Sequence, residues 1–359
     1  MIPIFPLNAS PGNDKMFVFP DKQLLGKICL SPFVSADIGI TGHVRICGCA
    51  DWMPTVIGNI NQHSLVNLIN NEKAKLIKQS IIDGTYRYCN GDTCGIINSG
   101  QLNNVNDFSG TMADTISSAT TNEIPREITL AIDKVCNLSC PSCRTHIINP
   151  SEEDEVLMHE MSQTLSRNLF SIPTDKEIFL TLSTTGEVFA SPLSLAFLNN
   201  INVLEFPGLK LNIQTNGLLC NKRWHRLGEL QTRVAKVTVT IDASTKEVYE
   251  KLRRGGRWED LLDNLEFLKE LKKQNGMRLH TRMIVQRDNY QQMLDFHAMS
   301  LEYNADQIEY SKIHTWEHLT AEQVRPMDVF DRRNPDFLKA NIILEKLKAL
   351  PNIMISGGL

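Results

Sequence analysis

The chain has 359 residues, of which 42% are hydrophobic and 22% are charged, a composition typical of soluble globular domains. Its formal net charge of -4 argues against a sequence-independent grip on nucleic acid, which needs clustered basic residues. No stretch approaches the roughly 20 apolar residues of a membrane-spanning helix, and the start lacks the basic region of a signal peptide. We therefore predict a cytoplasmic protein with no nucleic-acid partner and no membrane partner.

The nine cysteines fall into two clusters, and one stands alone. Five lie between Cys29 and Cys94, three lie between Cys136 and Cys143, and Cys220 is isolated. An odd number of unevenly spread cysteines in a chain of this length is not typical of a disulfide framework. Compact groups of thiols instead favour metal or iron-sulfur ligation, because thiolates are the soft ligands that these centres prefer.

The first cysteine cluster lies in a segment predicted to span residues 1–98, which is followed by a linker. Residues 99–125, SGQLNNVNDFSGTMADTISSATTNEIP, are rich in Ser, Thr, Asn and Gly and show little apolar periodicity. Such a composition is typical of a connection between structured segments. The sequence therefore predicts a domain boundary at this linker.

After the linker, short β-branched apolar runs alternate with helical patterns, which predicts parallel strands joined by helical crossovers. The expected strands are residues 127–133, 177–183, 209–215, 236–242, 278–286 and 307–312. The clearest helix is 258–276, WEDLLDNLEFLKELKKQNG, which ends in a Lys-rich turn and Gly276. We predict an α/β fold, a partial (β/α)6 TIM-like barrel over residues 126–318, followed by a helical extension at 319–359.

In such a sheet, ligands bind at the carboxyl ends of the strands, so the residues after each strand are candidates for chemistry. The first strand runs into KVCNLSCPSCR, the second into TTGEVFASP and the third into NGLLC. Arg282, Gln286 and Lys312 are candidates to line a substrate cavity, although alternation does not decide which of them faces inward. His314, Trp316 and His318 follow the sixth strand, where surface or capping roles are the commoner explanation.

The most specific motif is CxxxCxxC, formed by Cys136, Cys140 and Cys143. This spacing can bind three corners of a cubane while leaving the fourth iron without a protein ligand. A structural zinc site is the alternative, but zinc usually takes paired CxxC knuckles and four protein ligands. The motif therefore favours an iron-sulfur cluster with one open iron.

Residues 127 to about 315 resemble a radical S-adenosylmethionine (radical SAM) core domain, through CNLSCPSCR, TTGE, TNG, VTIDAS and EKLRRGG. The resemblance implies a 4Fe-4S cluster on Cys136, Cys140 and Cys143, whose open iron chelates S-adenosylmethionine. It also implies reductive cleavage to a 5'-deoxyadenosyl radical, which abstracts hydrogen from a substrate. The three cysteines are accordingly the predicted catalytic and metal-binding residues.

The resemblance also implies which residues contact S-adenosylmethionine: Thr185, Gly186, Glu187, Asn216, Thr240 and Arg253. The loop 185–187 would meet the amino group, Thr240 would lie near the ribose, and Arg253 or Arg254 would meet the carboxylate. Three positions depart from the family pattern. Thr185 replaces a glycine, Val188 replaces a proline, and Ser142 replaces the aromatic residue that usually packs on adenine.

Residues 26 to about 97 resemble the SPASM/twitch class of auxiliary iron-sulfur cluster domains, although such domains usually follow the barrel. The resemblance implies one auxiliary 4Fe-4S cluster held by Cys29, Cys47, Cys89 and Cys94, with Cys49 as a spare or substitute. Four thiolates close a cluster to substrate and leave electron transfer or structural support as its role. A zinc ribbon or a set of reduced structural thiols is the alternative.

The resemblance implies an enzyme that uses two 4Fe-4S clusters, S-adenosylmethionine and an external one-electron reductant such as flavodoxin or ferredoxin. Its expected reactions are oxidation, crosslinking or epimerisation in natural-product or peptide modification. We expect no separate leader-binding domain ahead of the cysteine-rich segment, which counts against a peptide substrate. The alternatives are a small-molecule dehydrogenase or isomerase acting on a sugar, nucleoside or amino acid, and a non-catalytic electron carrier or zinc scaffold.

Overall fold

The computed structural model describes residues 16–17, 24–105, 123–183, 185–315, 319–356 and 359. The chain divides into two compact units. The first comprises Met1–Asp133, Glu152–Thr185 and Pro192–Lys210, and the second comprises Lys134–Ser151, Gly186–Ser191 and Leu211–Leu359. Most of the predicted linker lies outside the described residues, as do Trp316 and His318.

The first unit is built on strands in the order β7-β6-β2-β3-β4. Strand β2 is parallel to β6, and β6 is parallel to β7, whereas β3 and β4 are added antiparallel. A separate antiparallel ribbon pairs β1 with β5. The bounds of these strands are β1 Lys27–Ile28, β2 Ser35–Ile38, β3 His43–Arg45, β4 Gly58–Asn59, β5 Asn103–Asn104, β6 Glu127–Ala131 and β7 Ile178–Ser183.

The helices described in the first unit are α1 (Ser31–Val34), α2 (Leu65–Ile69), α3 (Glu72–Ile82), α4 (Gly95–Asn98), α6 (Glu152–Leu169) and α7 (Pro192–Asn199). Helices α2 and α3 begin at side-chain caps. The Ser64 hydroxyl accepts the N–H of Asn67, and the Asn71 amide oxygen accepts the N–H of Ala74. Each cap satisfies a backbone donor that a helix start leaves unpaired, and so fixes where the helix begins.

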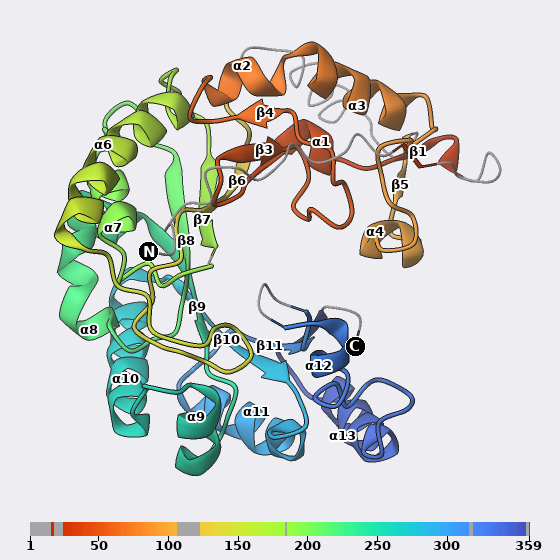
Figure 1. Cartoon of the computed structure of the whole chain (residues 1–359), viewed down its shortest axis with the longest axis vertical. Helices are drawn as coiled ribbons and strands as arrows, with labels where there is room; N and C mark the ends of the chain where they lie inside the picture. The colour runs from red at the N-terminus through yellow and green to blue at the C-terminus, as the bar shows by residue number, and fades with distance from the viewer. Residues whose placement is uncertain (1–15, 18–23, 106–122, 184, 316–318, 357–358) are drawn as a thin grey trace. The chain divides into compact units, whose positions relative to one another are not determined.

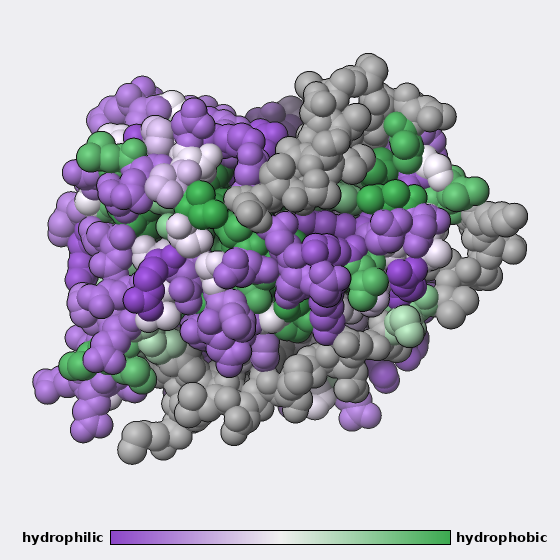
Figure 2. Space-filling model, turned by 90° about the horizontal axis from the view of Figure 1, so that it is seen from above, coloured by the Kyte–Doolittle hydropathy of each residue, from purple (hydrophilic) through white to green (hydrophobic). Residues whose placement is uncertain are grey.

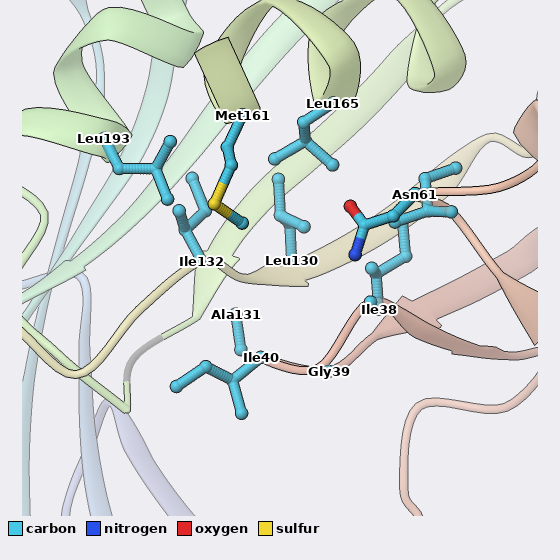
Figure 3. A pocket seen from close by; sticks show the side chains of 12 residues that line it. Ile38, Gly39, Ile40, Asn61, Leu130, Ala131, Ile132, Met161, Leu165 and Leu193 are labelled. Carbon is cyan, nitrogen blue, oxygen red and sulfur yellow. The ribbon is translucent and has the colours of Figure 1, made fainter. Parts of the chain in front are cut away.

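A mainly apolar pocket of about 330 Å³ lies between β2, β6 and α6 in the first unit (Figure 3). Met161 and Leu165 reach toward it from α6, while Leu130 and Ile132 line it from the segment of β6 (Figure 3). Asn61 adds one amide to this lining. Aliphatic side chains therefore hold α6 on the sheet here, and the thiols of this unit line a different pocket.

The second unit contains strands in the order β8-β9-β10-β11-β12, all of them parallel. Their bounds are β8 Leu209–Thr215, of which Leu211 onward belongs to this unit, β9 Val234–Thr240, β10 Arg278–Val285, β11 Gln307–Lys312 and β12 Ile353–Ser356. The helices are α8 (Cys220–Arg223), α9 (Lys246–Leu252), α10 (Trp258–Asn275), α11 (Met293–Glu302), α12 (Ala321–Val324) and α13 (Phe337–Lys348), with 3-10 segments at Trp224–Arg233 and Tyr290–Gln292.

The two faces of this sheet differ in polarity. Helices α10 and α11 pack on β10 (Figure 1). Alternate residues of β10 are buried, and the Thr281 hydroxyl donates to the Ser300 hydroxyl of α11 at 2.8 Å. Because side chains alternate along a strand, His280 and Arg282 lie on the opposite face. The structure therefore decides what alternation in the sequence left open: Arg282 is on the face away from α11.

The six predicted strands are all present, as β6 to β11, with bounds within two residues of those expected. The predicted helix is α10, and Gly276 follows it with a φ of 73°, in the left-handed conformation expected of a C-terminal glycine. Strands β1 to β5 and β12 were not predicted. Each sheet remains open, because β4 and β12 are each paired on one side only in the described residues. The fold is α/β, a partial barrel with a cysteine-rich N-terminal region.

Hydrophilic residues cover most of the described surface in Figure 2, and hydrophobic residues lie in small separate groups. Among the described residues, the most exposed large apolar side chains, Leu204, Leu338 and Val156, come from different segments of the chain. Among the helices that the structure describes, none combines the length and the apolar character needed to cross a bilayer.

Candidate metal centres

The three cysteines of the CxxxCxxC motif lie on a compact loop of the second unit. The N–H groups of Cys143 and Arg144 both donate to the carbonyl of Cys140 at 2.9 Å, which curls the second half of the motif. The N–H of Cys136 donates to the carbonyl of Ile148 at 3.0 Å, and the N–H of Ser139 donates to that of Arg254 at 2.9 Å. These bonds hold the start and the middle of the motif to Ile148 and Arg254 and curl its second half.

The environment of these thiols opposes the thiolate form unless a positive partner is present. Cys136 and Cys140 are buried, and burial raises the pKa of Cys136 to about 12. Burial also raises the pKa of Cys140, against the opposing charge of Arg253. A bound cation is the ordinary means of deprotonating such buried thiols, since metal ligation displaces the proton.

Each of the three thiols lies beside one side-chain nitrogen donor. Nη2 of Arg144 is 3.4 Å from Sγ of Cys143, Nη1 of Arg253 is 3.7 Å from Sγ of Cys140, and Nδ2 of Asn216 is 4.0 Å from Sγ of Cys136. The donors come from three separate parts of the chain. Such N–H···S contacts stabilise negative charge on sulfur.

Arg253 is held in place by a buried ion pair. Its Nη2 lies 2.8 Å from Oδ2 of Asp242, and the two side chains are 12% and 3% exposed. Oδ1 of Asp242 accepts the N–H of Ile284 at 2.7 Å, and Asp242 has a φ of 67°. A non-glycine residue in this left-handed region is uncommon and often marks a functional site. Asp242 therefore aims Arg253 at the cysteine loop.

Glu187 joins the end of β8 to the same loop. Its carboxylate is fully buried and accepts the hydroxyl of Thr215 at 2.7 Å and the N–H of Asn216 at 2.6 Å. The Asn216 amide then donates to Oδ1 of Asn137 at 2.9 Å, and the N–H of Glu187 donates to the carbonyl of Val135 at 2.7 Å. Glu187 thus orients Asn216 toward Asn137 and Cys136.

The structure therefore brings Cys136, Cys140, Cys143, Glu187, Asn216 and Arg253 into one network of contacts. The other predicted contacts to S-adenosylmethionine lie outside this network. Thr185 belongs to the first unit and its hydroxyl donates to the carbonyl of Asp133 at 2.8 Å, while Gly186 begins a segment of the second unit. Thr240 ends β9, half-buried, in register with Arg282 of β10.

Two buried polar atoms near Cys140 have no hydrogen-bond partner in the described part of the chain. They are Nε of Arg253 and the hydroxyl of Tyr249. Both side chains interact electrostatically with Cys140. Because buried polar groups are normally satisfied, these two fit an additional acceptor, such as a cluster sulfide or a carboxylate of a bound molecule.

Sequence reasoning missed three residues of this site: Arg144, Asp242 and Tyr249. Arg144 follows the third cysteine directly, and Asp242 lies within VTIDAS, one of the motifs that carried the resemblance. Arg144 and Asp242 therefore lie in motifs that the sequence already singled out, but the sequence does not show which side chains they contact. Only the folded chain shows that Arg144 meets sulfur and that Asp242 meets Arg253.

A second group of thiols lines a pocket of about 340 Å³ in the first unit. The cysteines of this lining are Cys29, Cys47, Cys89 and Cys94, and the rest is mainly apolar, with Trp52, Met53 and Tyr86. Burial raises the pKa of Cys47 to about 12 and raises those of Cys29 and Cys89, with further increases from the neighbouring thiols. These four cysteines face a common space.

Cys49 differs from these four residues. It does not contribute to the pocket lining, and burial raises the pKa of its thiol, against the opposing effect of the backbone at Trp52 and Asp51. In the described residues, no three metal-ligating side chains lie close enough to share a single ion. The thiolates of a cubane bind separate irons and so lie further apart than ligands of one ion.

Comparison with known proteins agrees with this arrangement. Residues 132–299 match the family model of the Radical SAM superfamily, and residues 29–95 match that of an iron-sulfur cluster-binding domain, SPASM. Residues 132–299 are therefore a radical SAM domain, the domain of a superfamily of enzymes, and a SPASM domain precedes it in the sequence. The first domain model implies a 4Fe-4S cluster and S-adenosylmethionine, and the second implies auxiliary iron-sulfur ligation.

Several solved structures are similar to this chain. SuiB of Streptococcus suis bound to S-adenosylmethionine is 15% identical, with 83% of this chain and 65% of that chain covered and a TM-score of 0.40. The structure of anSMEcpe with bound AdoMet is 16% identical, with 63% of this chain and 63% of that chain covered and a TM-score of 0.41. Methylornithine synthase, PylB, is also 16% identical, with 68% of each chain covered and a TM-score of 0.40. The chain thus spans about 65% of the length of SuiB. No protein of curated function matches it.

Proposed function

We propose that this chain reductively cleaves S-adenosylmethionine and abstracts hydrogen from a substrate, using a 4Fe-4S cluster held by Cys136, Cys140 and Cys143. The observation that carries the proposal is that these three thiols share one anchored loop and each lies beside a nitrogen donor. When bound, the cluster supplies one electron that cleaves S-adenosylmethionine into methionine and a 5'-deoxyadenosyl radical.

The protein groups proposed to hold S-adenosylmethionine are Thr185, Gly186, Glu187, Asn216, Thr240 and Arg253. The unpartnered Nε of Arg253 supports a role in meeting an acceptor, and its ion pair with Asp242 fixes the guanidinium before any ligand arrives. The Glu187 carboxylate already accepts several protein donors, so its proposed contribution to this site is indirect: it orients Asn216.

We propose that Cys29, Cys47, Cys89 and Cys94 hold an auxiliary 4Fe-4S cluster. Their shared pocket and mutual electrostatic coupling support this ligand set, and Cys49 remains a spare thiol outside the lining. Four thiolates leave no open iron, so the role of this cluster is electron transfer or structural support. An external one-electron reductant, such as flavodoxin or ferredoxin, is the expected partner. The expected location is the cytoplasm, because that reducing compartment keeps free thiols such as these from forming disulfides.

The substrate is proposed to be polar, because polar groups line the face of the second sheet that lies away from α11. Arg282 of β10 forms an ion pair at 2.6 Å with Glu309 of β11, and Glu309 also accepts the hydroxyls of Ser311 and Ser356. Gln286, just beyond β10, is buried with its Nε2 unpartnered in the described residues. These groups suit a peptide or a natural product that is oxidised, crosslinked or epimerised.

The test uses anaerobically reconstituted protein. Iron and sulfide are counted, S-adenosylmethionine and dithionite are added, and 5'-deoxyadenosine is measured. About eight irons per chain with 5'-deoxyadenosine formation is expected for two clusters. The Cys140→Ala variant should form no 5'-deoxyadenosine and lose about four irons. Bound zinc without cleavage would overturn the proposal. Assays with peptides, sugars, nucleosides and amino acids then separate peptide modification from a small-molecule dehydrogenase or isomerase.

A further inference from the structure

The donors beside the three motif thiols are unequal in charge. Arg144 and Arg253 carry cationic guanidinium groups, whereas Asn216 offers a neutral amide. The positive charge of Arg253 is partly neutralised by an ion pair, because its Nη2 lies 2.8 Å from Oδ2 of Asp242. The Arg144 contact is also the shortest of the three, because its Nη2 lies 3.4 Å from Sγ of Cys143, compared with 3.7 Å for Arg253 and 4.0 Å for Asn216.

Arg144 is also fixed in position. Its Nη1 donates to the carbonyl of Lys134 at 2.6 Å, at the start of the cysteine loop, while its Nη2 points at Sγ of Cys143. Its N–H donates to the carbonyl of Cys140, so the backbone is held as well. A guanidinium that is braced in this way presents its charge to the thiols at little entropic cost.

We propose that Arg144 sets the reduction potential of the cluster on Cys136, Cys140 and Cys143, acting through Cys143 as a positioning residue. Reduction adds one electron from an external reductant to the cluster and breaks no bond, so the reduced form carries one more negative charge. Hydrogen bonds and nearby positive charge stabilise that form and raise the potential. This inference rests on the proposed function, because it requires a cluster at this motif.

The experiment is an anaerobic redox titration of the full-length reconstituted protein, followed by electron paramagnetic resonance. The signal of the motif cluster is identified as the one that changes when S-adenosylmethionine is added. Arg144→Met removes both charge and donor, Arg144→Gln keeps a donor without charge, and Arg144→Lys keeps charge and a donor. We expect the Met variant to shift the reduction equilibrium at least tenfold toward the oxidised form, about 59 mV for one electron.

Arg254 provides the matched control. It braces the same loop, with Nε 3.0 Å from the Ser139 hydroxyl and Nη2 3.0 Å from the carbonyl of Thr145, but its side chain is exposed and its bonds go to oxygen. Arg254→Met is expected to leave the potential unchanged. An equal shift in the Arg254 and Arg144 variants, or no shift in Arg144→Met at full iron content, overturns the inference.

If Arg144→Met loses iron, its potential cannot be compared with that of the unmodified protein, and Arg144→Gln and Arg144→Lys are compared with each other instead. A more negative potential for Gln than for Lys, at equal iron content, supports the role of charge, and equal potentials overturn it. If the wild-type protein itself shows no signal that responds to S-adenosylmethionine, the proposed function fails. If that signal is present but insensitive to Arg144, only this inference fails.

Discussion

At the scale of single residues, the site depends on a few charged side chains that are fixed by buried partners. Asp242 and Arg253 form an ion pair in which both side chains are almost fully enclosed, and Glu187 is surrounded by donors. Such pairs contribute little net stability when they are intact, but an unpaired buried charge is costly. Their value is geometric, because they hold the donors of the cysteine loop in one orientation.

The variant Asp242→Asn tests this dependence. It leaves Arg253 as a buried cation without its carboxylate, although the amide oxygen can still accept the N–H of Ile284. We expect the free energy of unfolding to fall by about 3 kcal/mol, the usual cost of breaking a buried pair. Urea unfolding of both proteins in the same iron-loading state measures the difference. The exposed pair of Lys246 and Glu259 provides the control, because Glu259→Gln should change little.

At the scale of elements, tight turns and cross-strand pairs position the strands. The turn between β2 and β3 uses Gly42, whose φ is 78° and whose missing side chain leaves room for two asparagines. A Cβ there would lie 2.5 Å from Nδ2 of Asn61 and 2.6 Å from Oδ1 of Asn59. This glycine is therefore required for both its backbone conformation and its lack of a side chain.

Replacement of Gly42 by Ala should destabilise the chain more than the same change at Gly26. Gly26 has nearly the same φ, 77°, but no atom of the described residues lies within 4 Å of the position that a Cβ would take there. Gly26→Ala should cost about 1 kcal/mol for the left-handed backbone alone. Gly42→Ala should cost at least about 1 kcal/mol more, because its Cβ displaces the asparagines. Thermal or urea unfolding measures both, and equal losses would contradict the steric argument.

The cross-strand pair between β10 and β11 predicts a pH dependence. Burial would raise the pKa of Glu309, but Arg282, Ser356 and Ser311 lower it below its ordinary value of 4.5. A carboxylate with a depressed pKa in the folded state stabilises the fold above its unfolded pKa and loses that contribution as the pH falls. Unfolding free energies measured at pH 6 and below pH 4 should therefore decline less in Glu309→Gln than in the unmodified chain.

At the scale of the whole molecule, two thiol groups are built in different ways. The motif cysteines lie on one loop of eight residues, whereas the thiols of the first unit come from segments between Cys29 and Cys94. The motif is therefore local in the sequence, while the auxiliary pocket requires the first unit to fold around it. A cluster held by such separated segments couples its assembly to folding of that unit.

This difference predicts separable losses of iron. Cys47→Ala should lower the iron content by about four per chain and leave some 5'-deoxyadenosine formation, because the motif cysteines are intact. Cys49→Ala is the matched control from the same CGC sequence, and it should keep about eight irons. Iron and sulfide analysis with an assay of 5'-deoxyadenosine measures both variants. Loss of iron in Cys49→Ala with none in Cys47→Ala would show that Cys49 is the ligand.

The sequence by itself determined the class of the chain and the elements of its sheet. Six strands and helix α10 follow from apolar periodicity and a terminal glycine, which are local signals. The CxxxCxxC motif is equally local, since its three thiols lie within eight residues. The family models that match residues 29–95 and 132–299 agree with that assignment.

Only the tertiary structure decided which side chains meet those thiols and which strands extend the sheets. Strands β2 and β12 are four residues each, too short to stand out by periodicity, and they form because β6 and β11 present free edges beside them. Arg144 is adjacent to Cys143 in the chain, but Asn216 and Arg253 are 80 and 113 residues from the cysteines that they contact. Contacts at such separations depend on the packing of the whole unit, which no local pattern of residues records.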